Sequence, residues 1–133
     1  MGESLKSFEE LECWRACTEV RRYVMNVIKK FPSHERYSLC DDMTRAARSS
    51  THNIAEGFGR FHYQEKIQFC RQSRGSLQEL IDQCITAYDE HYLNDDEFRQ
   101  ARVLIDRAMA VLNGYINYLG RAKNNYSQLT DNR

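Results

Sequence analysis

Apolar residues recur along this chain at steps of three and four, and they do not alternate with polar residues over any long stretch. The clearest run consists of Phe98, Ala101, Ile105, Ala108, Leu112, Tyr115 and Leu119. Alternating steps of three and four form a heptad seam, which is typical of helices packed at a shallow left-handed crossing angle. The pattern predicts a helix over residues 95–120, capped by Asn94 and Glu97 and ended by Gly120.

The same periodicity predicts three further helices, over residues 8–31, 39–58 and 63–92. Ser7 and Glu10 have the spacing of a capping box before the first of them, and Pro32 ends it. Short connections between the segments force successive helices to run antiparallel. The sequence therefore predicts an all-α fold, an up-down-up-down antiparallel four-helix bundle.

The bundle is expected to occupy residues 1–121 as one domain, because 133 residues suffice for a single hydrophobic core. Residues 122–133 lose the periodicity and are predicted to form a disordered tail. No apolar run approaches the length of a membrane span, and the first residues lack the apolar core of a signal peptide. These features predict a cytoplasmic protein with no membrane partner.

Five cysteines are present, an odd number without any Cys-x-x-Cys pair. Four of them, Cys13, Cys17, Cys70 and Cys84, fall on the apolar stripes of the predicted helices. A free thiol in such a position behaves as a small hydrophobic group. Reduced cysteines within the core are therefore expected.

The run Asn53-Ile-Ala-Glu-Gly57 places an amide and a carboxylate on one face of the second helix, just before its end. Small residues on that helix and on the third predict a close approach of the two: Ala46, Ala47, Ser50, Ser73, Gly75 and Ser76. Asn53 and Glu56 are then expected to meet Arg74 in a buried polar network. Loss of the carboxylate from such a network would cost on the order of 3 kcal/mol.

A functional interpretation of the same run uses Glu56 and His52 as a base or as ligands of a metal-dependent enzyme. No nucleophile, second carboxylate or oxyanion donor accompanies them. The chain also lacks His-x-x-x-His and Glu-x-x-His spacings and a phosphate-binding loop. The sequence thus favours a protein that is not an enzyme and uses no metal or cofactor.

Charge is segregated along the chain, although the formal net charge is zero. Residues 77–98 carry seven acidic and no basic side chains, whereas residues 43–76 and 99–133 each carry a surplus of four positive charges. An up-down-up-down bundle would then have one acidic and one basic end. The candidate contacts to nucleic-acid phosphates are Arg45, Arg48, Arg60, Lys66, Arg71, Arg121 and Lys123. Charge runs of this kind also occur as merely solvated helix faces.

Eight tyrosines and Trp14 exceed what one small core needs, and amphipathic rings favour interfaces. Tyr23, Tyr92 and Tyr118 flank the seams. Self-association is therefore expected, although periodicity alone does not count the subunits.

Several short motifs resemble one family: Phe31-Pro32, Glu35-x-Tyr37-x-Leu39, Arg45-Ala-Ala, Ser49, Asn53-Ile-Ala-Glu-Gly57, Arg60 and Gly75-Ser-Leu-x-Glu-Leu80. They are similar to the small four-helix bundles encoded by intervening sequences in bacterial 23S ribosomal RNA genes. The resemblance extends from about Phe8 to Leu119. The chain departs from the family pattern at Ser38, Thr44 and Ser50, where glycine, arginine and isoleucine are common.

The resemblance implies a protein without catalytic residues that forms a ring-shaped homopentamer. It also implies a fold similar to the accessory protein of diversity-generating retroelements, which partners a reverse transcriptase and RNA. Family signature positions would be Asn53, Glu56, Gly57, Gly75, Ser76, Leu77, Glu79 and Leu80. The combined expectation is a non-enzymatic, oligomeric binding or scaffold protein that contacts RNA or DNA or assists a nucleic-acid enzyme. A protein–protein scaffold without nucleic acid is the alternative.

Overall fold

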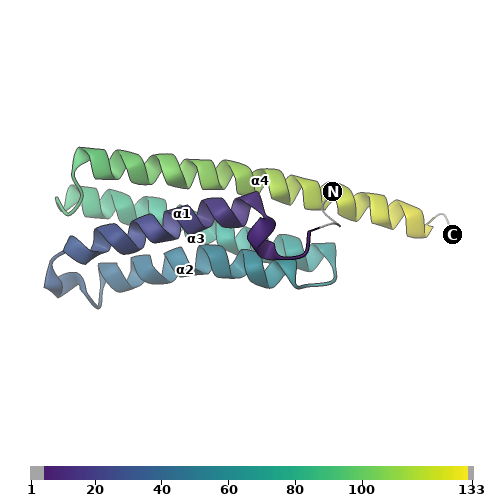
Figure 1. The fold of residues 1–133 in the computed structure, drawn as a ribbon, viewed down its shortest axis with the longest axis horizontal. Helices are drawn as coiled ribbons and strands as arrows, with labels where there is room; N and C mark the ends of the chain where they lie inside the picture. Colours follow the sequence, from purple (N-terminus) through teal and green to yellow (C-terminus); the bar gives the residue numbers. More distant parts are fainter. Residues whose placement is uncertain (1–4, 132–133) are drawn as a thin grey trace.

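The computed structural model describes residues 5–131, and its long helices lie side by side (Figure 1). The elements are the 3-10 turn η2 (Phe8–Glu10), α1 (Glu12–Val27), the turns η3 (Ile28–Lys30) and η4 (Ser33–Glu35), α2 (Leu39–Phe58), α3 (Tyr63–Asp89) and α4 (Asp95–Asp131). The described residues contain no strand. The predicted all-α four-helix architecture is confirmed. Residues 1–4 of the predicted domain and 132–133 of the predicted tail lie outside the described part.

The helices are arranged so that each packs on two neighbours: α1 on α2 and α4, and α3 on α2 and α4. The α1–α2 connection and the α3–α4 turn lie at one end of the bundle, and the α2–α3 turn lies at the other (Figure 1). Side chains from all four helices fill the centre, the largest fully buried ones including Met43, Ile54, Leu77, Leu80, Ile105 and Leu112. No helix in residues 5–131 combines the length and apolar character needed to cross a membrane.

The first helix differs from its prediction, because the segment over residues 8–31 is divided into three pieces. Ser7 and Glu10 do form a capping box, but it caps the short turn η2 rather than a long helix. Leu11 follows in an extended conformation with its side chain buried, and α1 begins only after it. The chain leaves α1 through a second 3-10 turn ahead of Pro32. Burial of Leu11 thus redirects the chain where helix periodicity alone would continue.

The C-terminus differs more, since α4 continues to Asp131 where a stop at Gly120 and a disordered tail were predicted. Gly120 lies inside the helix. The apolar seam in fact continues in the same register beyond Leu119, through Ala122, Tyr126 and Leu129. In Figure 1 this extension of α4, in yellow, projects past the end of the other three helices. Tyr126 and Leu129 are consequently 56% and 66% exposed.

All five cysteines are free thiols, and four of them are buried. Burial raises the pKa of the Cys17 thiol to about 12 and those of Cys70 and Cys84 to about 11. These groups are therefore neutral at physiological pH and act as core packing.

Candidate nucleic-acid interface

The polar run at the end of α2 begins with a hydrogen-bonded contact to α3. Asn53 is 8% exposed, and its amide nitrogen donates to the carbonyl and the hydroxyl of Ser49 at 3.0 and 2.8 Å. The Ser76 hydroxyl on α3 donates to the same Ser49 hydroxyl at 2.9 Å. The Asn53 amide nitrogen is thereby linked to the neighbouring helix through two serines. This contact helps to hold α2 against α3.

Small side chains next to this contact let the two backbones approach closely. Ser73 is fully buried and donates its hydroxyl to the Ser50 carbonyl at 2.6 Å. A Cβ at Gly57 would lie 2.9 Å from the Phe69 Cβ and 3.3 Å from the Lys66 carbonyl oxygen. At Gly75, by contrast, an added Cβ meets nothing within 4 Å. The close approach predicted from the small residues is therefore present between Ser50 and Ser73, but the part assigned to Gly75 is wrong. Gly57, predicted only as a possible helix end, provides a further close approach.

The predicted network of Asn53, Glu56 and Arg74 is also wrong. Glu56 accepts a hydrogen bond from Arg60 at 2.9 Å, with both side chains 41% exposed. Arg74 instead donates to Asn113 on α4 at 2.9 Å. Three residues advance a helix by about 300°, so Glu56 is rotated from the buried line of Asn53 toward solvent. There Arg60, in the turn just after the end of α2, pairs with it.

The residues of the enzymatic alternative point to different surroundings. His52 is exposed in a groove between α1 and α2 beside Arg21 and Arg48. Glu56 is paired with Arg60. Within residues 5–131 no three His, Cys, Asp or Glu side chains are grouped so as to hold a metal ion. Glu79, the remaining family signature position, lines a shallow groove between α2 and α3 with Asp42 and Arg45.

The seven candidate phosphate contacts do not form one surface. Arg45 and Arg48 lie in the first half of α2, away from the α2–α3 turn. Arg45 is paired with Asp42 at 2.7 Å and with Asp41 at 3.7 Å. These two arginines thus belong to grooves on opposite sides of α2 rather than to an end of the bundle.

The other five candidates gather toward the α2–α3 turn, and we call this region the basic end; it contains Arg60, Lys66, Arg71, Arg121 and Lys123. Arg60 is shared between Glu56 and Glu65, 2.9 and 3.9 Å away, and lies over the Phe69 ring. Arg71 bonds only to Gln68 at 3.1 Å, and Arg121 is exposed. Lys66 donates to the Phe58 carbonyl at 2.8 Å, where partial burial lowers its pKa.

Lys123 lies on the α4 extension and reaches α3. Its amine donates to the Gln64 side-chain oxygen at 2.7 Å. Among the described residues neither Lys66 nor Lys123 has a carboxylate partner within 4.0 Å. Both lysines therefore keep an uncompensated positive charge beside neutral oxygen atoms.

A hollow of about 330 Å³ lies between the α2–α3 turn and the α4 extension. Its walls carry two lysines, three aromatic rings and no carboxylate: Phe61, His62, Tyr63, Gln64, Lys66, Lys123, Tyr126 and Ser127. Phe61 is 81% exposed and Tyr126 is 56% exposed. Since α3 begins at Tyr63 without a side-chain cap, its positive dipole end adds to the potential here.

Sequence reasoning missed Phe61, His62 and Tyr126. The signal for Tyr126 was present, since it continues the seam of α4 by steps of three and four. An apolar Phe61 between polar Arg60 and His62, in a turn, was also visible, but nothing local showed that it would face Tyr126.

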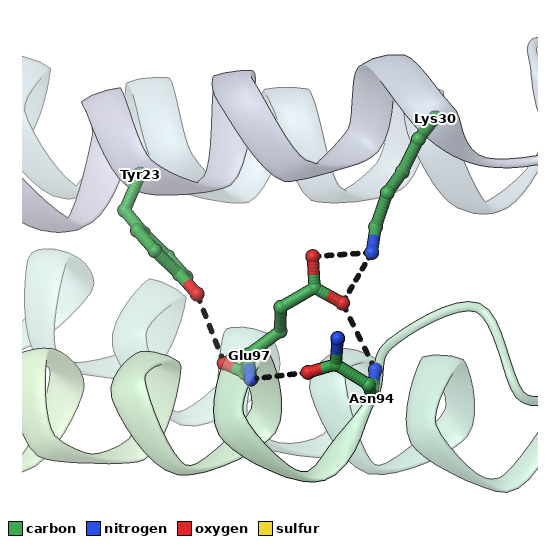
Figure 2. A network of polar contacts seen from close by, with 4 residues as sticks. All are labelled: Tyr23, Lys30, Asn94 and Glu97. Atoms are coloured by element: carbon green, nitrogen blue, oxygen red, sulfur yellow. Dashed lines mark hydrogen bonds and ion pairs between the residues drawn. The ribbon is translucent and has the colours of Figure 1, made fainter.

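The opposite end, which we call the acidic end, contains Asp89, Glu90, Asp95, Asp96 and Glu97 around the α3–α4 turn. Figure 2 shows Glu97 there, paired with Lys30 and accepting from the Asn94 backbone N–H at 2.9 Å. The Tyr23 hydroxyl donates to the Glu97 carbonyl at 3.1 Å.

Two further tyrosine hydroxyls at this end donate hydrogen bonds within the chain. Tyr92 donates to Glu35 at 2.9 Å, and Tyr88 donates to Asp95 at 2.5 Å. Three of the eight tyrosines are thus engaged within the chain at this end.

The fold and the site define a small helical bundle in which the polar run of α2 contacts α3 and the open surface of the basic end is aromatic and cationic. The chain belongs to the family described as 23S rRNA-intervening sequence protein, whose model matches residues 9–114. This family is not a known enzyme class. No curated protein gives a significant match to the sequence. The match ends before Lys123, Tyr126 and Ser127, so one wall of the hollow lies outside it.

Proposed function

We propose that the protein binds nucleic acid at its basic end, through contacts to the phosphate backbone. The observation that carries the proposal is the hollow between the α2–α3 turn and the α4 extension, with two lysines and no carboxylate in its walls. The neutral oxygens now facing Lys66 and Lys123 would give way to a charged phosphate oxygen. Arg71 and Arg121 extend the positive surface on either side.

Such contacts position a polymer without reading its sequence, because phosphates carry no base information. Binding should therefore depend strongly on salt. The role this supports is a non-enzymatic binding or accessory protein of the cytoplasm. An association with a nucleic-acid enzyme such as a reverse transcriptase is supported by the resemblance alone.

Self-association forms part of the same proposal, with five subunits as the number that the resemblance implies. In a closed ring all subunits point the same way, so their basic ends would combine into one charged face. Light scattering at micromolar concentration measures this directly, and a mass of 15.7 kDa would contradict it.

A protein partner without nucleic acid is a second candidate, favoured by the groove between α1 and α2. This groove has a volume of about 550 Å³ and combines apolar with polar side chains: Phe8, Trp14, Met25 and Ala55 with the arginines Arg21 and Arg48 and with Thr51 and His52. A groove between two helices that is lined in this way suits an acidic amphipathic helix.

The proposal is tested by titrating fluorescein-labelled 20-nucleotide RNA and DNA, single-stranded and duplex, at about 50 and 200 mM salt. Three phosphate contacts predict an affinity loss of about 20- to 40-fold over that range. The double variant Arg121→Glu, Lys123→Glu should abolish most of the binding at 50 mM salt. Arg99→Glu is the matched control, since Arg99 is an exposed arginine of the same helix at the acidic end. Absence of binding at 50 mM salt, or equal binding by both variants, would overturn the proposal.

A further inference from the structure

We infer that the basic end selects single-stranded nucleic acid by stacking unpaired bases on Phe61 and Tyr126. The inference rests on the proposed function and adds to it the class of polymer that is bound.

Phe61 has no structural role that explains its exposure. It lies in the turn between α2 and α3, 81% exposed, and its ring touches only the edge of His62 among aromatic groups, with centroids 5.0 Å apart at 87°. The tight packing beneath this turn is made instead by Gly57 and Phe69. An exposed ring at such a place offers a free aromatic face, which is what base stacking requires.

Tyr126 supplies a second ring from a different element. It lies on the α4 extension, where the seam of the helix continues past the other helices of residues 5–131. Tyr115 and Tyr118, about three and two turns earlier on α4, are partly buried, and their ring centroids lie 6.2 Å apart. Tyr126 and Phe61 instead face the same hollow from α4 and from the α2–α3 turn.

The hollow adds charge to these two rings. Lys66 and Lys123 line it together with Phe61 and Tyr126, and it contains no carboxylate. Aromatic faces beside a positively charged groove are the combination by which proteins hold single strands without sequence preference. The volume of about 330 Å³ is at the lower end of the range for small-ligand sites, so the space suits individual bases.

A duplex would gain little from this arrangement. Its bases are stacked within the helix, so it offers phosphates to Lys123 and Arg121 but no free base face to Phe61 or Tyr126. Selection of single strands therefore depends on the rings, whereas the shared affinity for both forms depends on the lysines and arginines.

The experiment compares a 12-nucleotide oligouridine and a 12-nucleotide oligothymidine with a duplex of equal length, on the full chain at 50 mM salt. Phe61→Ala and Tyr126→Ala should each weaken single-strand binding by about 5- to 100-fold and duplex binding less than twofold. The salt dependence should not change, because no phosphate contact is lost. Tyr37→Ala is the matched control, since Tyr37 is 85% exposed in the α1–α2 connection, at the other end of the bundle.

A gain-of-signal variant makes the test independent of loss of folding. Phe61→Trp keeps an aromatic face, so it should retain wild-type affinity, and its fluorescence should be quenched by oligouridine but not by duplex. Trp14, the one native tryptophan, lies in the α1–α2 groove and gives the background signal in the wild type.

Each outcome bears on one claim. Equal weakening of single strands and duplex by Phe61→Ala, or no weakening at all, overturns the stacking inference while phosphate binding stands. Unchanged oligouridine affinity together with a change of oligomer mass in Tyr126→Ala also overturns it, because the ring then serves a protein interface. Absence of binding to every oligonucleotide at 50 mM salt would instead overturn the proposed function itself.

Discussion

The two ends of this bundle carry opposite charge, and they differ in how far their charged groups are paired within the chain. At the acidic end, three of the five named carboxylates are paired or hydrogen-bonded within the chain: Glu97 with Lys30 and Asn94, Asp95 with Tyr88, and Asp96 with Arg99. At the basic end, Lys66 and Lys123 have only neutral oxygen partners, and Phe61 and Tyr126 are exposed.

The difference separates charges that stabilise the fold from charges that remain available. A carboxylate bonded to its own chain has little left to offer a partner, because a new contact must replace an existing one. A lysine beside an amide or a carbonyl gains from exchange with a phosphate. The stability of the basic end must then come from packing beneath it, at Gly57. Four predictions follow in order of expected effect.

The largest effect is expected for Gly57→Ala, which places a Cβ 2.9 Å from the Phe69 Cβ. Relief requires movement of α2 against α3, so the free energy of unfolding should fall by about 1–3 kcal/mol. Gly75→Ala is the control, since the site has open space within a helix and alanine should stabilise it by up to about 1 kcal/mol. Urea denaturation measures both. Equal effects of the same sign would show that the two glycines share one role after all.

Glu97→Ala tests the acidic end, and the free energy of unfolding should fall by on the order of 1 kcal/mol. The variant removes the acceptor of the Asn94 N–H and the partner of Lys30. Asp96→Ala is the control, because Asp96 and its partner Arg99 are 92% and 69% exposed. Its free energy of unfolding should fall by no more than about 0.5 kcal/mol. Thermal melting distinguishes the two. If Asp96→Ala proved the more harmful, the network of Figure 2 would have no stabilising role.

The same network predicts a pH dependence of smaller size. The hydrogen bond from Lys30, followed by that from the Asn94 backbone, lowers the pKa of Glu97 below its usual 4.5. A depressed folded-state pKa contributes stability above about pH 4.5 that is lost as the pH falls through the folded value. The stability difference between wild type and Glu97→Gln should therefore shrink between pH 6 and pH 3. A constant difference across this range would contradict the assignment.

The smallest effect is expected for Glu56→Ala at the basic end. The Glu56–Arg60 pair joins the last turn of α2 to the residue after its cap, and both side chains are 41% exposed, so its loss should cost only about 0.3–0.5 kcal/mol. This replaces the value of about 3 kcal/mol expected for a buried network. A double-mutant cycle with Arg60→Ala measures the pair directly. A coupling energy of several kcal/mol would restore the buried network.

Local sequence patterns were sufficient to predict some helix caps and the apolar seam of α4. The capping boxes of Ser7 with Glu10 and of Asn94 with Glu97 were predicted from spacing and are present. The heptad seam of α4 was also readable, and its continuation to Leu129 in the same register was overlooked because Gly120 and the polar residues around it suggested an end.

Partners across helices could not be predicted in the same way. Small residues on α2 and α3 indicated close packing, but which glycine makes the contact depends on the relative rotation and shift of the helices. The same two quantities direct Arg74 toward Asn113 and leave Glu56 to Arg60.

The sequence by itself determined the all-α four-helix architecture, because periodicity and cap spacing are local properties that each segment carries alone. Its charge segregation likewise implied two unlike ends. Only the tertiary structure decided which charges are engaged and which are free, and it alone placed Phe61 opposite Tyr126 across 65 positions of the chain. The physical reason is that helix packing decides whether two side chains lie within a few ångströms of each other. A small rotation of a helix exchanges one partner for another.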